Sequence, residues 1–251
     1  MNILYSDLKG KTIIITGGLG FLASQFTKAF KNNSSNVIIL DKKNSNKKDF
    51  FNCDITKERD LRAAVLIIKK KYKTIDVLIN NAANNYAPDS NSIETRLENF
   101  SEKIWDADLA VGLKGAMLCT KVFGAEMNRQ TTGGNIINIS SDLGIISPDN
   151  RIYKKKFVKP ISYSVVKHGI IGLTKYTATY WPKKIRCNAL AFGGMKNNHN
   201  KNFLKKIQKL IPMGRMAKKN EYNNTILFLA SKASSYINGA TIVIDGGRTI
   251  L

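Results

Sequence analysis

A tyrosine and a lysine four residues apart carry the clearest chemistry in this chain. Tyr163 and Lys167 lie in a segment whose pattern predicts a helix, where this spacing places both side chains on one face. A phenol has a pKa near 10, too high for efficient proton transfer at neutral pH. A lysine ammonium about 6 Å away would stabilise the phenolate by roughly 3 kcal/mol and lower that pKa. The pair predicts a general acid or base, although an exposed helical pair is the simpler interpretation of the spacing alone.

A glycine-rich turn predicts a site for phosphate groups. The segment 16–23, Thr-Gly-Gly-Leu-Gly-Phe-Leu-Ala, follows an apolar strand and leads into a helix. Glycines let a pyrophosphate approach the backbone, and the N-terminus of the helix offers N–H groups with a partial positive charge. Asp41 ends the next predicted strand, about 20 residues on, where an acid can bind the adenosine ribose and repel a 2′-phosphate. NAD is therefore the expected cofactor, with NADP as the alternative that Lys42 and Lys43 leave open.

Short β-branched runs alternate with helical patterns along the whole chain. Near-continuous apolar strands of this kind predict a parallel sheet that is covered on both faces. No linker or repeat interrupts the pattern, so the expectation is an α/β fold, one doubly wound, Rossmann-like domain over residues 1–251. Strands are expected at 12–16, 37–40, 75–79, 135–140, 185–190 and 241–245, and helices at 21–31, 57–71, 101–128, 162–180 and 221–230.

Composition excludes several classes of protein. No apolar run approaches the roughly 20 residues that span a bilayer, and the first residues do not resemble a secretion signal. Cys53, Cys119 and Cys187 have neither metal-ligand spacing nor an even count, so we expect no metal, no disulfide and a reducing, cytoplasmic setting. The net charge is +22, but the lysines recur in nearly every polar segment without a nucleic-acid-binding motif. No specific nucleic-acid or membrane partner is expected.

Together, several segments resemble the single-domain short-chain dehydrogenase/reductase family over nearly the whole chain. They are 16–23, Asn-Asn-Ala-Ala at 80–83, Asn-Ile-Ser-Ser at 138–141, Tyr163 with Lys167, Ile-Arg-Cys-Asn at 185–188 and Ile-Asp-Gly-Gly at 244–247. The resemblance implies that Tyr163 is the general acid or base, that Lys167 lowers its pKa and binds the nicotinamide ribose, and that Ser141 holds the substrate oxygen. It implies cofactor contacts from Tyr163 and Lys167 and from Gly17, Gly18, Gly20, Phe21, Leu22, Asp41, Asp54, Ile55, Asn81, Ala82, Ala83, Gly193 and Met195.

The chain departs from the family pattern at three positions. Gly112 stands where members often carry a catalytic asparagine, so a proton relay through that side chain is not available. A packing or hydration reason for this glycine is expected, because glycine inside a helix costs about 1 kcal/mol relative to alanine. Phe192 replaces the usual proline before Gly193, and Asn197 stands where a threonine often meets the cofactor.

The connection 149–161 between Ser141 and Tyr163 is long and strongly basic. Both of its ends bear catalytic residues, so it must pass near the mouth of the site. Arg151, Lys154 and Lys155 are the expected contacts to an anionic substrate, with a merely solvated loop as the alternative. A similar insertion in relatives associated with bacterial surface-sugar and flagellin modification favours an activated or acidic sugar. The segment 196–211 predicts an amphipathic helix that closes over substrate or packs on the body.

The sequence thus predicts an NAD(P)-dependent oxidoreductase that interconverts an alcohol and a carbonyl on a small polar, anionic or sugar-derived molecule. One alternative is a reductase of 3-oxoacyl groups on acyl carrier protein, which would prefer NADPH. A second is a dinucleotide-binding scaffold or sensor without turnover. The resemblance also implies a homo-oligomer, a dimer or tetramer assembled through the helical regions 106–127 and 162–180.

Overall fold

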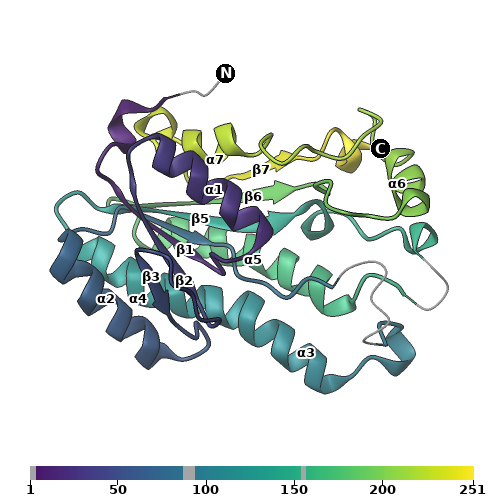
Figure 1. The fold of residues 1–251 in the computed structure, drawn as a ribbon, viewed down its shortest axis with the longest axis horizontal. Helices are drawn as coiled ribbons and strands as arrows, with labels where there is room; N and C mark the ends of the chain where they lie inside the picture. Colours follow the sequence, from purple (N-terminus) through teal and green to yellow (C-terminus); the bar gives the residue numbers. More distant parts are fainter. Residues whose placement is uncertain (1–3, 87–93, 154–156) are drawn as a thin grey trace.

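The computed structural model describes residues 4–86, 94–153 and 157–251, and a seven-stranded sheet forms the centre of this part of the chain (Figure 1). Every pair of neighbouring strands is parallel. The strand order is β3-β2-β1-β4-β5-β6-β7. From β1 the chain adds strands on one side, and from β4 it adds them on the other side. In open parallel sheets, ligands bind at this switch between β1 and β4. The strands are β1 (Thr12–Thr16), β2 (Asn36–Asp41), β3 (Phe50–Asn52), β4 (Val77–Asn80), β5 (Gly134–Ser141), β6 (Ile185–Phe192) and β7 (Thr241–Ile244).

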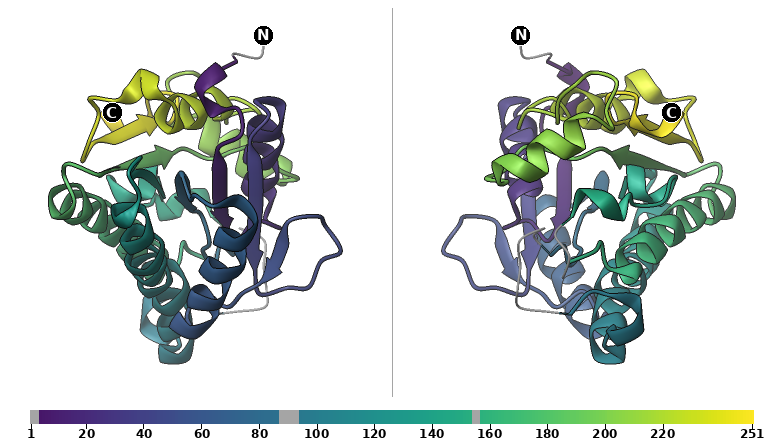
Figure 2. Two further views of the ribbon diagram at one scale, coloured as in Figure 1. Left: turned by 90° about the vertical axis from the view of Figure 1, so that its left-hand side faces the viewer. Right: turned by 90° about the vertical axis from the view of Figure 1, so that its right-hand side faces the viewer.

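Helices cover both faces of the sheet (Figures 1 and 2). One face carries α1 (Phe21–Asn32) and α7 (Asn223–Ala230). The other carries α2 (Glu58–Tyr72), α4 (Gly115–Arg129) and α5 (Ile161–Tyr180). Two shorter helices lie outside these layers: α3 (Glu102–Leu109), which precedes α4, and α6 (Lys201–Gln208).

The central strand β1 shows why the strands are continuously apolar. Ile14 packs into the core beneath α2 and α4, whereas Ile13 and Ile15 pack into the core beneath α1 and α7. Successive side chains on a strand point to opposite faces, so a sheet covered on both sides needs apolar residues at every position. All five residues of β1 are buried.

The expected fold class is confirmed, with two local differences, and the expected helix in 196–211 is present as α6. The edge strand β3 was not predicted, because three residues are too few to show a periodic pattern. The helix expected at 101–128 is divided by a π-helical segment, Ala110–Lys114, between α3 and α4. In the expected lid, α6 buries Phe203 and Ile207 against Ile152 and Met216. None of the described helices is long and apolar enough to cross a bilayer.

Candidate active site

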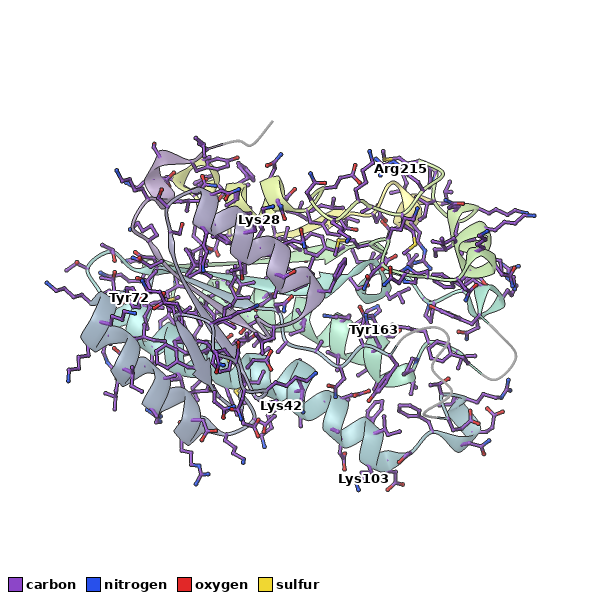
Figure 3. All side chains as sticks on the ribbon, in the orientation of Figure 1. Lys28, Lys42, Tyr72, Lys103, Tyr163 and Arg215 are labelled. Atoms are coloured by element: carbon purple, nitrogen blue, oxygen red, sulfur yellow. The ribbon has the colours of Figure 1, made fainter. Side chains whose placement is uncertain are left out.

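A cavity of about 830 Å³ lies at the carboxyl ends of β1, β2, β4, β5 and β6. Figure 3 labels Lys42 and Tyr163, two of the residues in its wall. Gly18 and Arg151 are outside that wall. The predicted site residues that line the cavity are Gly17, Gly20, Phe21, Leu22, Asp41, Asp54, Ile55, Asn81, Ala82, Ala83, Ser141, Tyr163, Lys167, Gly193 and Met195.

The glycine turn places the N-terminus of α1 at this cavity. Gly17 has φ +61°, and a Cβ there would lie 2.8 Å from the Cα of Ala82. Gly18 serves packing, since a Cβ would lie 2.4 Å from Cγ2 of Ile39. Gly20 is the N-cap of α1, and no described side chain caps this end. The first N–H groups of the helix therefore remain available for a pyrophosphate, which fits a dinucleotide.

Asp41 is held between the glycine turn and the loop after β2. The backbone N–H of Leu19 donates to Oδ2 at 3.1 Å, and the N–H of Lys43 donates to Oδ1 at 3.1 Å. Lys42 and Lys43 also line the cavity, so the carboxylate and two cations stand at the same end. This end has the polar groups that an adenosine ribose requires.

Lys167 is fixed in the wall by contacts between α5 and β5. Its Nζ donates to the carbonyl of Ile139 at 2.8 Å and lies 5.6 Å from the ring centre of Tyr163. Ser140 donates from Oγ to the carbonyl of Lys167 at 2.8 Å, which ties the helix to the strand from the other direction. Ser140 thus joins the strand to the helix, and the neighbouring Ser141 lines the cavity together with Tyr163.

Burial controls the protonation of this pair. Burial lowers the pKa of Lys167 to about 8. Burial also raises the pKa of Tyr163 to about 12, against the opposing effect of the hydrogen bond with Ser141. In the protein alone, burial therefore sets the direction of the Tyr163 pKa, and the lowering of this pKa by Lys167 stays a prediction.

Two residues that sequence reasoning missed complete this end of the site. Ser141 donates from Oγ to Oδ1 of Asp142 at 2.7 Å and accepts the N–H of Leu143 at 3.2 Å. The other carboxylate oxygen of Asp142 accepts from Arg248 at 2.6 Å, and both side chains of this ion pair are buried. Asp142 and Arg248 both line the cavity. No sequence signal links the two positions.

Among its described residues, the basic connection lines the cavity with three side chains that were not predicted, and the predicted Arg151 does not line it. Arg151 points to solvent, with 88% of its side chain exposed, and donates two hydrogen bonds to the carboxylate of Asp149. Lys154 and Lys155 lie outside the described residues. The residues of this connection that line the cavity are Tyr153, Phe157 and Lys159.

Two of the three departures from the family pattern, Gly112 and Phe192, have packing explanations. Gly112 is buried in the π-helical segment, and a Cβ there would lie 2.6 Å from Cγ1 of Val166. Phe192 stacks on Tyr222 with ring centres 4.1 Å apart. Tyr222 donates from its hydroxyl to the carbonyl of Gly193 at 2.7 Å, so the aromatic pair fixes the backbone of the predicted nicotinamide contact.

Comparisons with known proteins show which family the chain resembles. The family model described as enoyl-(acyl carrier protein) reductase matches residues 25–249. An NAD-dependent glycerol dehydrogenase from Listeria innocua is 29% identical over 97% of this chain and 96% of that protein. The 3-oxoacyl-[acyl-carrier-protein] reductase FabG of Thermotoga maritima is 31% identical over 97% of this chain and 99% of that protein.

A solved structure has the same overall fold as this chain. The short chain dehydrogenase of Leptospira borgpetersenii, crystallised with bound NAD+, has a TM-score of 0.87 and 29% identity, covering 96% of this chain and 93% of that one. Among the residues that the structure describes here, no cluster of His, Cys, Asp or Glu could hold a metal ion. On its fold, its cavity and these matches, the chain belongs to the short-chain dehydrogenase/reductase family.

Proposed function

We propose that the chain is an NAD-dependent oxidoreductase that interconverts an alcohol and a carbonyl. The observation that carries the proposal is that Ser141, Tyr163 and Lys167 share one cavity with the glycine turn and Asp41. The turn and α1 would hold the pyrophosphate, and Asp41 would hold the adenosine ribose. When bound, NAD supplies the carbon that accepts or returns a hydride.

The protein side chains would manage the proton. The raised pKa of Tyr163, about 12, keeps its phenol protonated at neutral pH, ready to donate to a carbonyl oxygen. In alcohol oxidation the phenolate must form first, so the oxidation rate should rise with pH. Ser141 would hold the substrate oxygen, and the charged form of Lys167 would stabilise the developing phenolate.

We propose a small polar substrate that is anionic or sugar-derived. The relative named as a glycerol dehydrogenase supports a polyol-like molecule. Lys159, Lys167 and Arg248 outnumber Asp142 at the Tyr163 end of the cavity, which supports an anionic one. An activated or acidic sugar, as used in surface-sugar and flagellin modification, satisfies both conditions.

The test begins with binding of NAD, NADH, NADP and NADPH, followed by turnover of polyols, sugars and sugar acids. Tyr163→Phe should retain NADH binding and lose about 10²- to 10⁴-fold in turnover on the best substrate. Unchanged turnover in this variant would refute the proton-transfer role. If NADH bound and no substrate was turned over, the scaffold or sensor alternative would take precedence.

A second candidate is reduction of 3-oxoacyl groups on acyl carrier protein. It is favoured by the 31% identical relative with that activity in its name and by the excess of basic residues. It predicts faster turnover of an oxoacyl thioester with NADPH than of any free polyol or acid with NADH. The carboxylate of Asp41, which would repel a 2′-phosphate, favours the first candidate.

We also propose a homo-oligomer that assembles through α4 and α5. These helices expose Met117, Val165, Tyr176 and Tyr180, whose exposed fractions range from 39% to 65%. Light scattering after size exclusion would measure the mass. The variant Tyr176→Arg should reduce the mass if this face is the interface, and a monomeric unmodified protein would contradict the proposal.

A further inference from the structure

Lys159 occupies an unusual position beside the predicted catalytic tyrosine. Its Nζ lies 3.8 Å from the ring centre of Tyr163, nearer than the Nζ of Lys167 at 5.6 Å. Both lysines line the cavity. The reacting oxygen of a substrate must lie within hydrogen-bond distance of the Tyr163 hydroxyl. A ligand atom that contacts Lys159 is therefore only a few covalent bonds from the reacting carbon.

The ammonium of Lys159 is held in place by a neutral group. Nζ donates to Oδ1 of Asn85 at 2.7 Å. The loop that carries Asn85 is fixed through its neighbours, because Asn84 and Tyr86 both donate to Oδ1 of Asp108, at 2.8 and 3.0 Å. The other oxygen of Asp108 accepts from Ser162 at 2.6 Å, which joins the loop to the start of α5. The cation is thus positioned before any substrate arrives.

The ammonium of Lys159 has no ion-pair partner among the described residues: none of their carboxylate oxygens lies within 4.0 Å of it. Asp142, the nearest acid in the cavity wall, is already paired with Arg248. Burial lowers the pKa of Lys159 to about 7, and the charge of Lys167 acts in the same direction, against the raising effect of Asp142 and Asp108. A cation that is partly withdrawn from water without an ion-pair partner is costly, and an anion beside it would favour its charged form.

We propose that Lys159 binds a carboxylate of the substrate, so that the substrate is a short hydroxy acid or its oxo form. This inference rests on the proposed function and narrows its substrate class. A carboxylate fits better than a phosphate, because the site offers one point charge and one amide. The guanidinium of Arg248, the group suited to a phosphate, is engaged by Asp142.

The first experiment measures binding without turnover. Acetoacetate and malonate would be titrated into the NADH-loaded protein, and the fluorescence of the cofactor would report their binding. Acetone serves as the uncharged control, and inorganic phosphate serves as the control for a different anion. The unmodified protein should bind the carboxylates, and Lys159→Met should bind them about 10- to 100-fold more weakly, the loss expected for one charge-assisted hydrogen bond. Lys159→Arg should restore part of the affinity. Lys205→Met, which removes an exposed lysine of α6 outside the cavity wall, is the matched control.

The second experiment compares matched substrates: glycerate with glycerol, and 3-hydroxybutyrate with 1,3-butanediol. Lys159→Met should raise KM for the acids and lower kcat/KM for the acids at least about tenfold more than kcat/KM for the uncharged partners. An equal loss for acids and diols, or no weaker binding of carboxylates, would overturn the inference. Carboxylate binding that depends on Lys159 without turnover of any substrate would instead refute the proposed function alone. NADH affinity, expected to be unchanged in Lys159→Met, shows that the variant is folded.

Discussion

Arg248 and Asp142 form a buried ion pair in which Nη1 lies 2.6 Å from Oδ2, although 106 residues separate them along the chain. The same carboxylate accepts the hydroxyl hydrogen of Ser141. The pair therefore connects the 3₁₀ turn Arg248–Ile250 to the end of β5 and orients a residue of the proposed active site. Breaking it should affect both stability and activity.

The first prediction concerns this ion pair. Arg248→Met leaves a buried carboxylate without its cation, so the free energy of unfolding in urea should fall by about 3–5 kcal/mol. The double variant Arg248→Met with Asp142→Asn should recover much of the loss, because no uncompensated charge remains. Arg62→Met breaks an exposed pair with Glu58 and should lower the free energy of unfolding far less, because solvent screens this pair. Equal losses at the two sites would contradict the importance of burial.

The second prediction concerns the missing asparagine. Gly112→Asn should lower the free energy of unfolding by about 1–3 kcal/mol, because its Cβ would overlap Val166. Adding Val166→Ala should restore part of the stability by making room. Thermal denaturation of the single and double variants measures both effects. A stable Gly112→Asn protein with faster turnover would show instead that the glycine only removes a proton relay.

The third prediction concerns Tyr222. Tyr222→Phe retains the stack on Phe192 but removes the hydrogen bond to the carbonyl of Gly193. The backbone of Gly193 lines the cavity, so NADH should bind about fivefold more weakly, the effect of losing about 1 kcal/mol. Tyr222→Leu, which also removes the stack, should lower the melting temperature further. If Tyr222→Phe bound NADH normally, the backbone would not depend on this hydroxyl.

The fourth prediction concerns pH. Burial lowers the pKa of Lys159 to about 7, whereas an unfolded lysine has a pKa near 10.4. Between these values the unfolded chain binds more protons than the folded one, so this lysine makes the free energy of unfolding rise with pH. The difference in stability between the unmodified protein and Lys159→Met should therefore shift in favour of the unmodified protein from pH 7 to pH 10. Parallel stability curves would show that Lys159 is solvated.

The fifth prediction concerns the thiols. Cys53, Cys119 and Cys187 are all buried and free. Burial raises the pKa of Cys53 and Cys187 to about 12 and that of Cys119 well above its ordinary value. Since the thiolate is the reactive form, the native protein at pH 8 should not react with Ellman's reagent, and the denatured protein should release colour for all three thiols. Rapid reaction of one thiol in the native protein would contradict this burial.

The sequence alone was sufficient to predict those parts of the structure that a local pattern of residues determines. The run 12–16 predicted a strand, and the spacing of Tyr163 and Lys167 predicted neighbours on one helix, because both patterns act over a few residues. The ion pair of Asp142 with Arg248 depends on tertiary packing, so no short pattern could reveal it. Lys159 is one lysine among many in the sequence, and only the fold distinguishes it by placing it against Tyr163. The raised pKa of Tyr163 in the protein alone follows from its burial, which cannot be read from spacing.

The π-helical segment Ala110–Lys114 has a consequence for how this helix tolerates insertions and deletions. A π turn accommodates about one residue more than an α turn. Deleting one residue here would convert the π turn into an α turn, so the helix before it and the helix after it would keep their relative phase. Asp108 would stay aligned with Ser162, and Leu118 and Val122 would stay in the core. A deletion in α3 or α4 themselves would instead rotate one part of the helix by about 100° relative to the other, so this segment is the place where the helix best tolerates losing a residue.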